Sequence, residues 1–312
     1  MRWLILGAGA LGGFYGARLL QAGADVSFLV RPRRQQQLAR DGLVVRTQDD
    51  ETLRHKVRTL QQGEVDGRYD VVLLTCKAYD LPGAMDAIAP AVGDGTAILP
   101  VLNGVRHIDV LKERFGAKCV LGGMSVINAA LLPDGAIQQS QVRINMNYHG
   151  ELDGKVTPRC TSIAQDLRLI DGKAVPDIGV QMWGKLFGYA CNATVTTLTR
   201  SRAGVIARST AGADFVSSVI GEVASVVAAE AGTPAPPEVG NIIRGMFAQP
   251  NSTYGPSILV DMEEGRTTEG EHTIGDLVDR ATRRSIPVPI LTAARCNLQA
   301  YEINRAAGAQ SQ

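Results

Sequence analysis

Apolar residues in the first part of the chain fall into short continuous runs separated by segments with helical spacing. Residues 3–6 and 25–30 form two such runs, and between them the apolar residues of 10–21 recur every three or four positions. This pattern predicts a strand, a helix and a second strand. The same pattern predicts further strands at 42–46, 69–75, 97–99 and 119–121, and helices at 84–88 and 108–115. Strands that alternate with helices predict a parallel, doubly wound α/β sheet, with 42–46 as its third strand.

The pattern changes twice farther along the chain. Between residues 125 and 147, short β-rich pieces surround Pro133-Asp134-Gly135, which predicts a hairpin at the edge of the sheet. After Asp177, alanine-rich segments with helical spacing replace the strands, as at 211–231 and 274–284. A chain of 312 residues is long for one hydrophobic core. We therefore expect an α/β domain over 1–176 and a second, all-helical domain over 177–312. Helix breaks are expected at Pro234, Pro236 and Pro237, and a frayed tail at 308–312.

A Gly-x-Gly-x-x-Gly motif joins the first expected strand to the first expected helix. Gly7 allows a tight turn, Gly9 lets the backbone approach a pyrophosphate, and Gly12 lets the helix pack closely on the sheet. The free N–H groups and the dipole at the helix amino terminus favour that anion. A glycine turn that binds nothing is the alternative. The surrounding strand–helix–strand unit favours a Rossmann-type dinucleotide site made by Gly7, Ala8, Gly9, Ala10, Leu11 and Gly12.

The end of the second expected strand indicates which dinucleotide binds. NAD sites usually place an Asp or Glu there to accept the ribose hydroxyls, whereas an Arg accommodates the 2′-phosphate of NADP. Here the strand leads into Val30-Arg31-Pro32-Arg33-Arg34, with no carboxylate at its end. Because guanidinium groups present paired donors that suit phosphate, we expect NADP(H) as the cofactor, with Arg31 as its main phosphate ligand. A solvated basic loop is the alternative.

The composition is that of an ordinary globular protein, with 45% apolar residues, 20% charged residues and a net charge of +1. This balance gives no reason to expect nucleic acid or an anionic membrane as a partner. The cysteines are scattered, without Cys-x-x-Cys pairs, so neither a disulfide framework nor a metal site is expected. Glycines interrupt the apolar amino terminus, which argues against a signal peptide, and no apolar run reaches the length of about eighteen residues that spans a membrane. We expect a cytoplasmic protein. Its oligomeric state is left open, with a homodimer as one alternative.

Polar residues at strand ends and at the start of the helical domain are the candidates for chemistry, because two-domain nucleotide enzymes commonly bind substrate between their halves. Lys77 follows a buried strand, and Asn103 begins an Asn-Gly turn after the next one. Lys185, Tyr189 and Asn192 share one face of an expected helix, at positions i, i+4 and i+7. Ordinary loop residues are the alternative for Lys77 and Asn103, and a lysine that extends to solvent is the alternative for Lys185.

Together these segments resemble the ketopantoate reductase (2-dehydropantoate 2-reductase) family, in its order and spacing and over nearly the whole chain. The resemblance implies hydride transfer from NADPH to the carbonyl of a small-molecule 2-keto acid, 2-dehydropantoate or a related one, to give the 2-hydroxy acid. It rests on the glycine motif, Arg31, Leu74-Thr75-Cys76-Lys77-Ala78, Leu102-Asn103-Gly104-Val105, Trp183-Gly184-Lys185-Leu186, Ser257 to Asp261, and Arg266-Thr267-Thr268-Glu269.

The resemblance implies a role for each matched residue. Arg31 and Lys77 would bind the phosphate and ribose side of the cofactor, and Asn103 would position the nicotinamide or the substrate. Lys185 would be the general acid. Glu269 would hold the substrate hydroxyl and pair with the lysine.

A lysine suits the acid's role on chemical grounds. Hydride addition builds negative charge on the carbonyl oxygen, so an ammonium group both stabilises and protonates that oxygen. By the same resemblance, Ser257 would contact the substrate carboxylate. Well-known members of the family also carry asparagines four and eight residues after the lysine, where this chain has Tyr189 and Ala193. Asn192 shares the helix face and is the alternative for one of them. We therefore expect Tyr189 and Asn192 to contact the substrate, and hypothesise a larger or more aromatic 2-keto acid.

The residues around Glu269 predict a local structure as well. Thr268 and Glu271 have the spacing of a capping box, which would place Glu269 in the first turn of a helix, where the dipole favours an ionised carboxylate. A charge at a helix start with no catalytic role is the alternative for Glu269. His272 is interpreted as a surface or packing residue, and Asp261 is left between a site residue and a structural cap.

Two other functions stay open at this point. One is another hydroxyacid or opine-type dehydrogenase, which would share the first domain; the set Lys185, Ser257 and Glu269 argues against it. The other is a non-catalytic NADPH-binding sensor that has the same fold.

Overall fold

The computed structural model describes residues 1–140 and 145–310, the last two as backbone only, and its internal contacts divide the chain into two compact units. The first unit comprises 1–102 and 107–181. The second comprises the short segment 103–106 and the chain from Met182 onward. The division therefore lies between 181 and 182, inside helix α6 (Ile178–Thr199), rather than between 176 and 177. The segment that contains Asn103 belongs to the helical unit.

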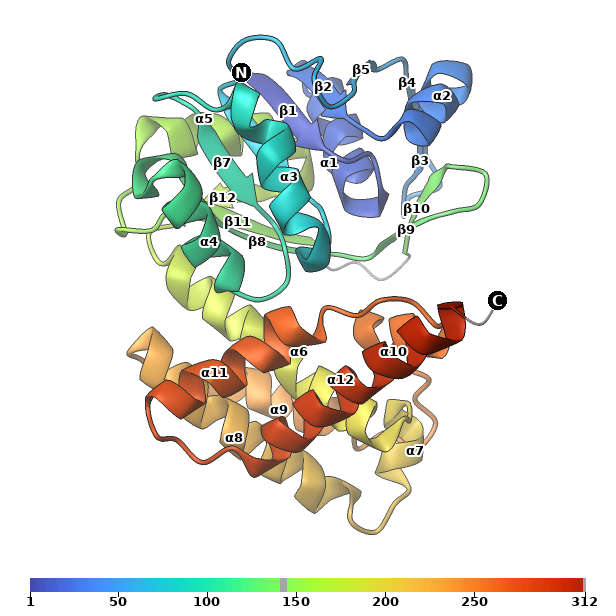
Figure 1. Ribbon diagram of the computed structural model, residues 1–312, viewed down its shortest axis with the longest axis vertical. Helices are drawn as coiled ribbons and strands as arrows, with labels where there is room; N and C mark the ends of the chain where they lie inside the picture. The colour runs from blue at the N-terminus through green and yellow to red at the C-terminus, as the bar shows by residue number, and fades with distance from the viewer. Residues whose placement is uncertain (141–144, 311–312) are drawn as a thin grey trace. The chain divides into compact units, whose positions relative to one another are not determined.

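The centre of the first unit is a five-stranded parallel sheet in the order β5-β2-β1-β6-β7 (Figure 1). The chain winds outward from β1 in both directions. Doubly wound sheets bind their ligands at the carboxyl ends of the strands beside such a reversal. The predicted Rossmann-type sheet is confirmed. Its strands are β1 (Arg2–Leu6), β2 (Asp25–Leu29), β5 (Arg58–Leu60), β6 (Val71–Leu74) and β7 (Ala97–Pro100).

Helices of this unit pack on the sheets through small and apolar residues. Helix α1 buries Phe14, Tyr15 and Leu19, and a Cβ at Gly16 would lie 2.1 Å from the ring of Phe28 on β2. Glycine at this position therefore lets the helix lie close to the strand. The helices of the unit are α1 (Ala10–Gln21), α2 (Pro32–Asp41), α3 (Leu81–Ile88), α4 (Arg106–Phe115) and α5 (Pro158–Asp166).

Two expectations about strand partners are wrong. The segment expected as the third strand forms β3 (Leu43–Arg46), but it lies in a separate four-stranded sheet in the order β4-β3-β10-β9, and β5 takes the place beside β2. The expected hairpin is β9 (Ala129–Leu131) with β10 (Ile137–Gln139), and it joins β3 instead of the edge of the parallel sheet. The remaining strand is β4 (Thr52–His55). Hydrophobic pattern identifies a strand and its buried face, but not its neighbour.

The strand expected at 119–121 is also shifted. Residues 117–119 form a 3-10 turn, Val120 bridges to Ile98, and the strand itself is β8 (Leu121–Ile127). It pairs antiparallel with β11 (Asn145–Glu151), which pairs in parallel with β12 (Gly172–Ala174).

A buried polar network fixes α1 against this third sheet. The Tyr15 hydroxyl donates to Oδ1 of Asn147 at 2.6 Å, and the Ser125 hydroxyl donates to the same oxygen at 2.9 Å. The Asn147 amide donates to the carbonyl of Ile170 at 2.7 Å. Because the hydroxyl is removed from solvent, burial raises the pKa of Tyr15.

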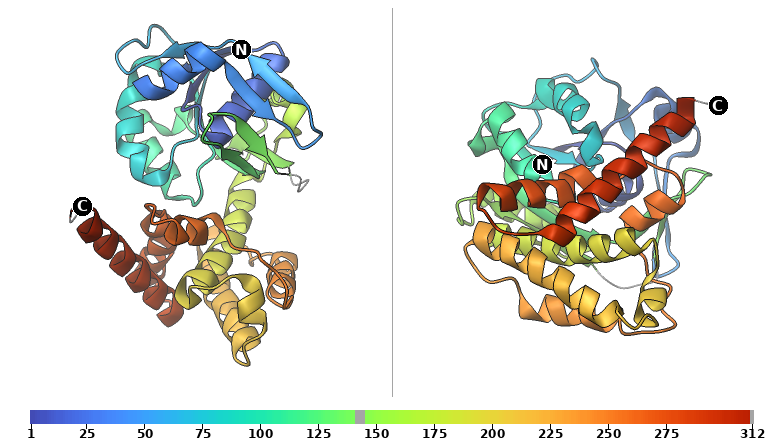
Figure 2. Two further views of the ribbon diagram at one scale, coloured as in Figure 1. Left: turned by 90° about the vertical axis from the view of Figure 1, so that its right-hand side faces the viewer. Right: turned by 60° about the horizontal axis from the view of Figure 1, so that its bottom comes forward.

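The second unit is helical throughout the part that the structure describes, as predicted, and Figure 2 shows its long helices α6, α8 and α12. The predicted break at the prolines is present, since α8 ends at Ala231, Gly232 follows it with φ +69°, and Pro237 opens α9. Of the tail expected to fray at 308–312, residues 308–310 continue α12, and 311–312 lie outside the described residues. Besides α6, the helices are α7 (Ala203–Ala207), α8 (Gly212–Ala231), α9 (Pro237–Met246), α10 (Ser257–Glu263), a π-helix (Glu271–Gly275), α11 (Asp276–Arg283) and α12 (Pro289–Gln310).

By length and composition, α8 is the one helix among the described residues that passes the criterion for a membrane span. Its contacts are those of a core helix. The Glu222 carboxylate accepts the backbone N–H groups of Ile290 and Leu291 at 3.0 Å, and so caps α12. The Glu230 carboxylate accepts from Arg280 at 2.8 Å. Its buried apolar residues are Val216, Val219, Ile220, Val223, Val226 and Val227.

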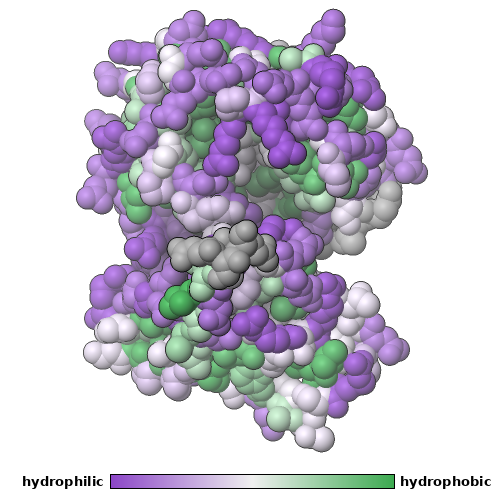
Figure 3. Space-filling model, turned by 45° about the vertical axis from the view of Figure 1, so that its right-hand side comes forward, coloured by the Kyte–Doolittle hydropathy of each residue, from purple (hydrophilic) through white to green (hydrophobic). Residues whose placement is uncertain are grey.

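On the face drawn in Figure 3, hydrophobic residues are interspersed among hydrophilic ones.

Candidate active site

The glycine turn after β1 has the geometry that a phosphate ligand needs. Gly7 has φ +89°, and its N–H donates to the carbonyl of Leu29 at 2.9 Å. A Cβ on Gly12 would lie 2.3 Å from the carbonyl oxygen of Gly7, so the helix reaches the turn only with glycine there. A Cβ on Gly9 would meet no atom within 4 Å. Protein packing therefore does not require glycine at Gly9, and the open space admits a ligand beside the helix amino terminus.

A cavity of about 710 Å³ adjoins this turn within the first unit. Its wall includes residues 7–9 of the turn, Arg31 after β2, Gln61 after β5, and Thr75 and Cys76 after β6. The wall also includes residues of the turn and helix that follow β6, namely Tyr79, Asp80, Pro82, Gly83, Ala84 and Ala87. Volume and position suit one half of a dinucleotide at the carboxyl ends of parallel strands.

Arg31 lies at this cavity, as the sequence predicts, and Lys77 lies beside it. The Arg31 side chain is 83% exposed, and its Nη2 is 3.3 Å from Oδ1 of Asp80. Lys77 is half-buried and precedes a 3-10 turn (Ala78–Asp80). Among the described residues the cavity wall includes Cys76 and not Lys77. Arg31 is therefore an exposed cation at the cavity rim, with the Asp80 carboxylate at hydrogen-bonding distance.

Arg34 has a function in this site that the sequence did not predict. Its Nε donates to the carbonyl of Ala8 at 2.9 Å, and its Nη1 donates to the carbonyl of Gly135 at 3.0 Å and to Gln37 at 2.6 Å. Burial lowers the pKa of Arg34. This side chain ties the glycine turn to the β9–β10 hairpin, so the basic cluster separates into a structural arginine and the exposed Arg31.

In the second unit, α6 carries the three residues that were expected on one helix face. Lys185 and Tyr189 are half-buried, and Asn192 is buried. Oδ1 of Asn192 has no hydrogen-bond partner within the described part of the chain. Burial lowers the pKa of Lys185 from 10.5 to about 8, and the nearby Glu269 carboxylate opposes part of that shift. Lys185 is therefore a cation at neutral pH that gives up its proton more easily than an exposed lysine.

Glu269 is the carboxylate that organises the second unit's candidate site. It is 5% exposed, and its Oε2 accepts a hydrogen bond from the Asn103 amide at 3.4 Å. Its charge also acts on Lys185 and on Tyr189. Glu269 is thus in contact with Asn103, which the sequence did not predict, and Lys185 lies within electrostatic range of it.

His272 is a packing residue, one of the two alternatives that the sequence left, and it lies within electrostatic range of Glu269. A Cβ on Gly104, where φ is +85°, would lie 3.1 Å from Cδ2 of His272, so the Asn103-Gly104 turn packs directly against the imidazole. Burial lowers the pKa of His272 to about 4, the charge of Glu269 opposes this shift and that of Arg106 adds to it. His272 is therefore neutral at physiological pH. It is the second residue of the π-helical turn (Glu271–Gly275), a backbone irregularity that often occurs at functional sites.

The predicted capping box is wrong. The N–H and the hydroxyl of Thr268 both donate to Oε1 of Glu302 on α12, at 2.7 and 2.9 Å, and Glu271 turns toward Arg295 instead. Glu269 lies just before the helix, and its carbonyl accepts from the N–H of Thr273 at 3.2 Å. The acceptor for Thr268 therefore comes from a helix far along the chain, which local spacing could not reveal.

Ser257 and Tyr189 form the other side of this site. Ser257 is the first residue of α10, directly after Pro256, and it is exposed. The Tyr189 and Ser257 hydroxyls are hydrogen-bond partners, and burial raises the pKa of Tyr189. Asp261 is fixed by the guanidinium Nε of Arg266 at 2.9 Å, so its structural interpretation is favoured.

The second unit thus assembles a buried carboxylate, a lysine of lowered pKa, an amide and two neutral hydroxyls. This set can hold a substrate with a carboxylate and an adjacent carbonyl, and it can supply one proton. No group of metal-ligating side chains is present among the described residues, and no cysteine there forms a disulfide.

Comparison with known families and proteins agrees with this geometry. Residues 3–151 match the ketopantoate reductase PanE/ApbA family, and residues 177–302 match its C-terminal family. An uncharacterized oxidoreductase of Bacillus subtilis, YkpB, is 33% identical over 98% of this chain and 100% of that protein. The 2-dehydropantoate 2-reductase of Archaeoglobus fulgidus is 30% identical, covering 88% of this chain and 89% of the relative.

Solved structures share the fold over nearly the full length. The 2-dehydropantoate 2-reductase of Geobacter metallireducens has a TM-score of 0.84 and 26% identity, covering 96% of this chain and 99% of its own. D-mandelate dehydrogenase with NADH and anilino(oxo)acetate has a TM-score of 0.85 and 20% identity, covering 98% of this chain and 100% of its own. The chain belongs to the ketopantoate reductase family and is a 2-dehydropantoate 2-reductase-like oxidoreductase.

Proposed function

We propose that this protein uses NADPH to reduce a 2-keto acid to the 2-hydroxy acid, with Lys185 as the general acid. The observation that carries the proposal is the pairing of Lys185, whose pKa burial lowers to about 8, with the buried carboxylate of Glu269. A catalytic acid works best when its pKa lies near the working pH. Membership of the family supports the same reaction class.

The proton step follows from the position of the ionisable groups. Bound NADPH supplies a hydride to the carbonyl carbon. The Lys185 ammonium donates its proton to the carbonyl oxygen, so the C=O group becomes C–OH and the lysine becomes neutral. Glu269 accepts a hydrogen bond from the new hydroxyl, while the Asn103 amide keeps the Glu269 carboxylate in place. Lys185 then regains a proton from solvent.

The preference for NADPH rests on the first unit. The glycine turn Gly7 to Gly12 would hold the pyrophosphate, Arg31 would bind the 2′-phosphate at the cavity rim, and Lys77 would contact the ribose side. An exposed guanidinium in place of a carboxylate at the end of β2 favours a phosphorylated ribose. The phosphate would compete with Asp80 for Arg31, since Asp80 holds that guanidinium at 3.3 Å.

The substrate we propose is larger or more aromatic than ketopantoate. Tyr189 stands where well-known family members have an asparagine, and its hydroxyl pairs with Ser257, which is the residue expected to contact the carboxylate. The two hydroxyls can bind a carboxylate as neutral donors, and the Tyr189 ring offers an apolar surface to an aromatic side chain. Asn192 has a buried oxygen with no described partner and is the remaining polar candidate on α6.

The test is to follow NADPH and NADH oxidation with a panel of 2-keto acids that includes ketopantoate, phenylglyoxylate and branched aliphatic examples. The proposal expects NADPH to be preferred and an aromatic or bulky 2-keto acid to give the highest kcat/KM. A preference for NADH contradicts the assignment of Arg31. Tight NADPH binding without oxidation by any 2-keto acid contradicts the enzymatic proposal. Ketopantoate as by far the best substrate contradicts the substrate class alone.

A further inference from the structure

Glu269 is the middle residue of a short segment that is fastened to α12 on both sides. On the amino-terminal side, Thr268 donates twice to one carboxylate oxygen of Glu302, at 2.7 Å from its N–H and 2.9 Å from its hydroxyl. The other oxygen of Glu302 accepts from Nε of Arg305 at 2.9 Å. Glu302 is thereby held in one orientation while it binds the residue before Glu269.

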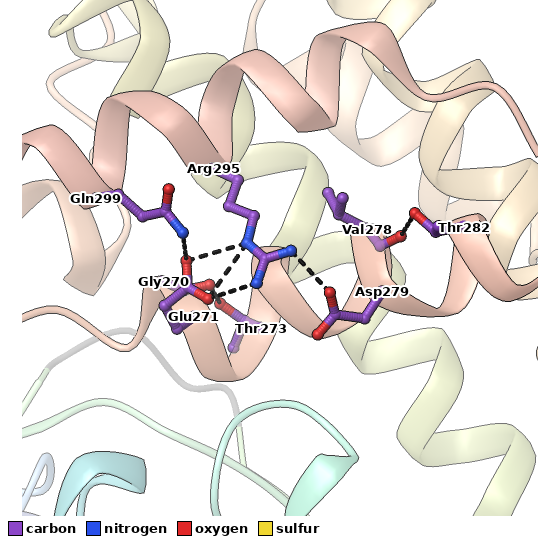
Figure 4. Close-up of polar contacts among 8 residues, drawn as sticks. All are labelled: Gly270, Glu271, Thr273, Val278, Asp279, Thr282, Arg295 and Gln299. Carbon is purple, nitrogen blue, oxygen red and sulfur yellow. Dashed lines mark hydrogen bonds and ion pairs between the residues drawn. The ribbon is translucent and has the colours of Figure 1, made fainter.

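On the carboxyl-terminal side, Glu271 is held by two residues of α12 (Figure 4). Its Oε2 accepts from Nη2 of Arg295 at 2.8 Å, and its Oε1 accepts from the Gln299 amide at 2.9 Å. Nη1 of Arg295 donates at 2.7 Å to Asp279, so the same guanidinium also binds α11. The second residue after Glu269 is therefore also fastened to α12.

Gly270 brings the backbone itself against α12. A Cβ at this position would lie 2.8 Å from Cδ1 and 3.2 Å from Cβ of Leu298. Glycine therefore lets the backbone directly after Glu269 contact the helix without an intervening side chain. A larger residue would require Leu298 or this segment to shift.

The four contacting residues of α12 form one stripe of that helix. Arg295, Leu298, Gln299 and Glu302 occupy positions i, i+3, i+4 and i+7, which lie on a single face. Their partners are residues 268, 270 and 271, the immediate neighbours of Glu269. One rigid helix face thus determines where the carboxylate-bearing residue sits.

We propose that this α12 stripe, Arg295, Leu298, Gln299 and Glu302, positions the Glu269 carboxylate for the reaction, with Glu302 as its principal positioning residue. The inference rests on the proposed function of Glu269. Positioning matters here because a displacement of about 1 Å in an active site can cost about a hundredfold in rate. Supporting contacts of this kind hold a site residue in its productive geometry without touching the substrate.

The experiment compares Glu302→Ala with Glu302→Gln, which keeps an oxygen that can accept from Thr268. Both changes are made in the wild type and in a Glu269→Gln background. Arg284→Ala is the matched control, because it removes an ion pair with Glu230 in the same unit, at 2.5 Å, without contact to the Glu269 segment. Gln299→Ala, which removes a single hydrogen bond from a neutral amide of the stripe to the Glu271 carboxylate, is the second variant if Glu302→Ala unfolds. Melting temperatures and NADPH Kd are measured for each.

Glu302→Ala should lower kcat about tenfold with an unchanged NADPH Kd, while Glu302→Gln and Arg284→Ala should leave kcat at the wild-type value. Gln299→Ala should lower kcat about threefold. The alkaline limb of the kcat profile should move to lower pH in Glu302→Ala, because a displaced Glu269 supports the Lys185 cation less. In the Glu269→Gln background, Glu302→Ala should have no further effect on kcat.

The inference is overturned if folded Glu302→Ala keeps the wild-type kcat, or if it lowers kcat by the same factor with and without the Glu269 carboxylate. The second outcome would mean that Glu302 acts on the fold and not through Glu269. A different outcome identifies a failure of the proposed function: if Glu269→Gln alone leaves kcat unchanged, Glu269 has no part in the reaction and the positioning proposal falls with it.

Discussion

The amide of Asn103 donates to the carboxylate of Glu269 at 3.4 Å, although 166 residues separate them in the sequence. Asn103 follows the last strand of the parallel sheet, but by its contacts it belongs to the helical unit. The same carboxylate opposes the effect of burial on the pKa of Lys185. The Glu269 carboxylate therefore accepts a hydrogen bond from the neutral Asn103 amide and stabilises the charged form of Lys185. A change of charge at Asn103 or Glu269 should alter this arrangement.

Replacing Asn103 tests this dependence on charge. Asn103→Ala removes one donor, and we expect a moderate loss of kcat/KM, about tenfold, which corresponds to one hydrogen bond to a charged group. Asn103→Asp places a second carboxylate beside a buried one, so we expect a larger loss at pH 7. Steady-state kinetics of the two variants with the best 2-keto acid make the comparison. If Asn103→Asp is no worse than Asn103→Ala, the two side chains do not interact in the working enzyme.

The pH profile should show the lowered pKa of Lys185. Reduction needs the ammonium form, which is present below its pKa of about 8 and lost above it, so kcat for reduction should fall above about pH 8. Oxidation of the 2-hydroxy acid needs the neutral amine and should rise over the same interval. Glu269→Gln removes the charge that supports the cation, so the limb should move to lower pH.

His272 provides the control for that profile. Burial lowers its pKa to about 4, so it stays neutral from pH 5 to 8 and His272→Gln should leave the alkaline limb in place. An alkaline limb near pH 10.4, the ordinary pKa of an exposed lysine, would show that burial does not lower the pKa of Lys185.

Cofactor choice should depend on Arg31 and Asp80. Arg31→Ala should weaken NADPH binding about tenfold or more and leave NADH binding unchanged, because a charge-assisted hydrogen bond contributes about 1.5–3 kcal/mol. Asp80→Asn frees the guanidinium from its carboxylate and should strengthen NADPH binding. Fluorescence titration measures each Kd. Arg33→Ala is the control, since this exposed arginine lies next to the site in sequence and does not line the cavity. If Arg31→Ala weakened the binding of NADPH and NADH by the same factor, a contact between Arg31 and the 2′-phosphate would be contradicted.

Substrate choice should depend on Tyr189. Tyr189→Asn restores the residue found in well-known family members and removes both the ring and the hydroxyl that pairs with Ser257. We expect the ratio of kcat/KM for phenylglyoxylate to that for ketopantoate to fall about tenfold or more, because an aromatic contact and its burial contribute more than 1 kcal/mol. Tyr189→Phe keeps the ring and is the matched control. If Tyr189→Asn left this ratio of kcat/KM values unchanged, the substrate side chain would not contact Tyr189.

The sequence predicted those parts of the site that depend on local spacing. The glycine turn, the exposed Arg31 and the shared helix face of Lys185, Tyr189 and Asn192 are present as expected. The partners of Thr268 and Arg34 were not predictable in this way. Thr268 bonds to Glu302, 34 residues away, and Arg34 bonds to Gly135, 101 residues away. Both contacts exist because packing brings distant elements together, and no local pattern encodes them.

The pairing of strands also could not be predicted from the local sequence pattern. The apolar run in β3 is evident in the sequence, but β5, with only three residues, pairs with β2 in its place. A hydrophobic run indicates burial, and either sheet would satisfy it. The position of His272 was not predictable for another reason. His272 lies in a π-helical turn and packs against Gly104, and helical spacing in the sequence does not specify a π-helical turn.

The most direct test of the account is the rate of hydride transfer in Lys185→Ala, measured in a single turnover with saturating NADPH and the best 2-keto acid. Loss of a positioned general acid should lower this rate by about 10² to 10⁴ while leaving the NADPH Kd unchanged. Lys173→Ala serves as the control, because this exposed lysine pairs with Asp171 in the other unit. Equal single-turnover rates for wild type and Lys185→Ala would contradict the assignment of Lys185 as the proton donor.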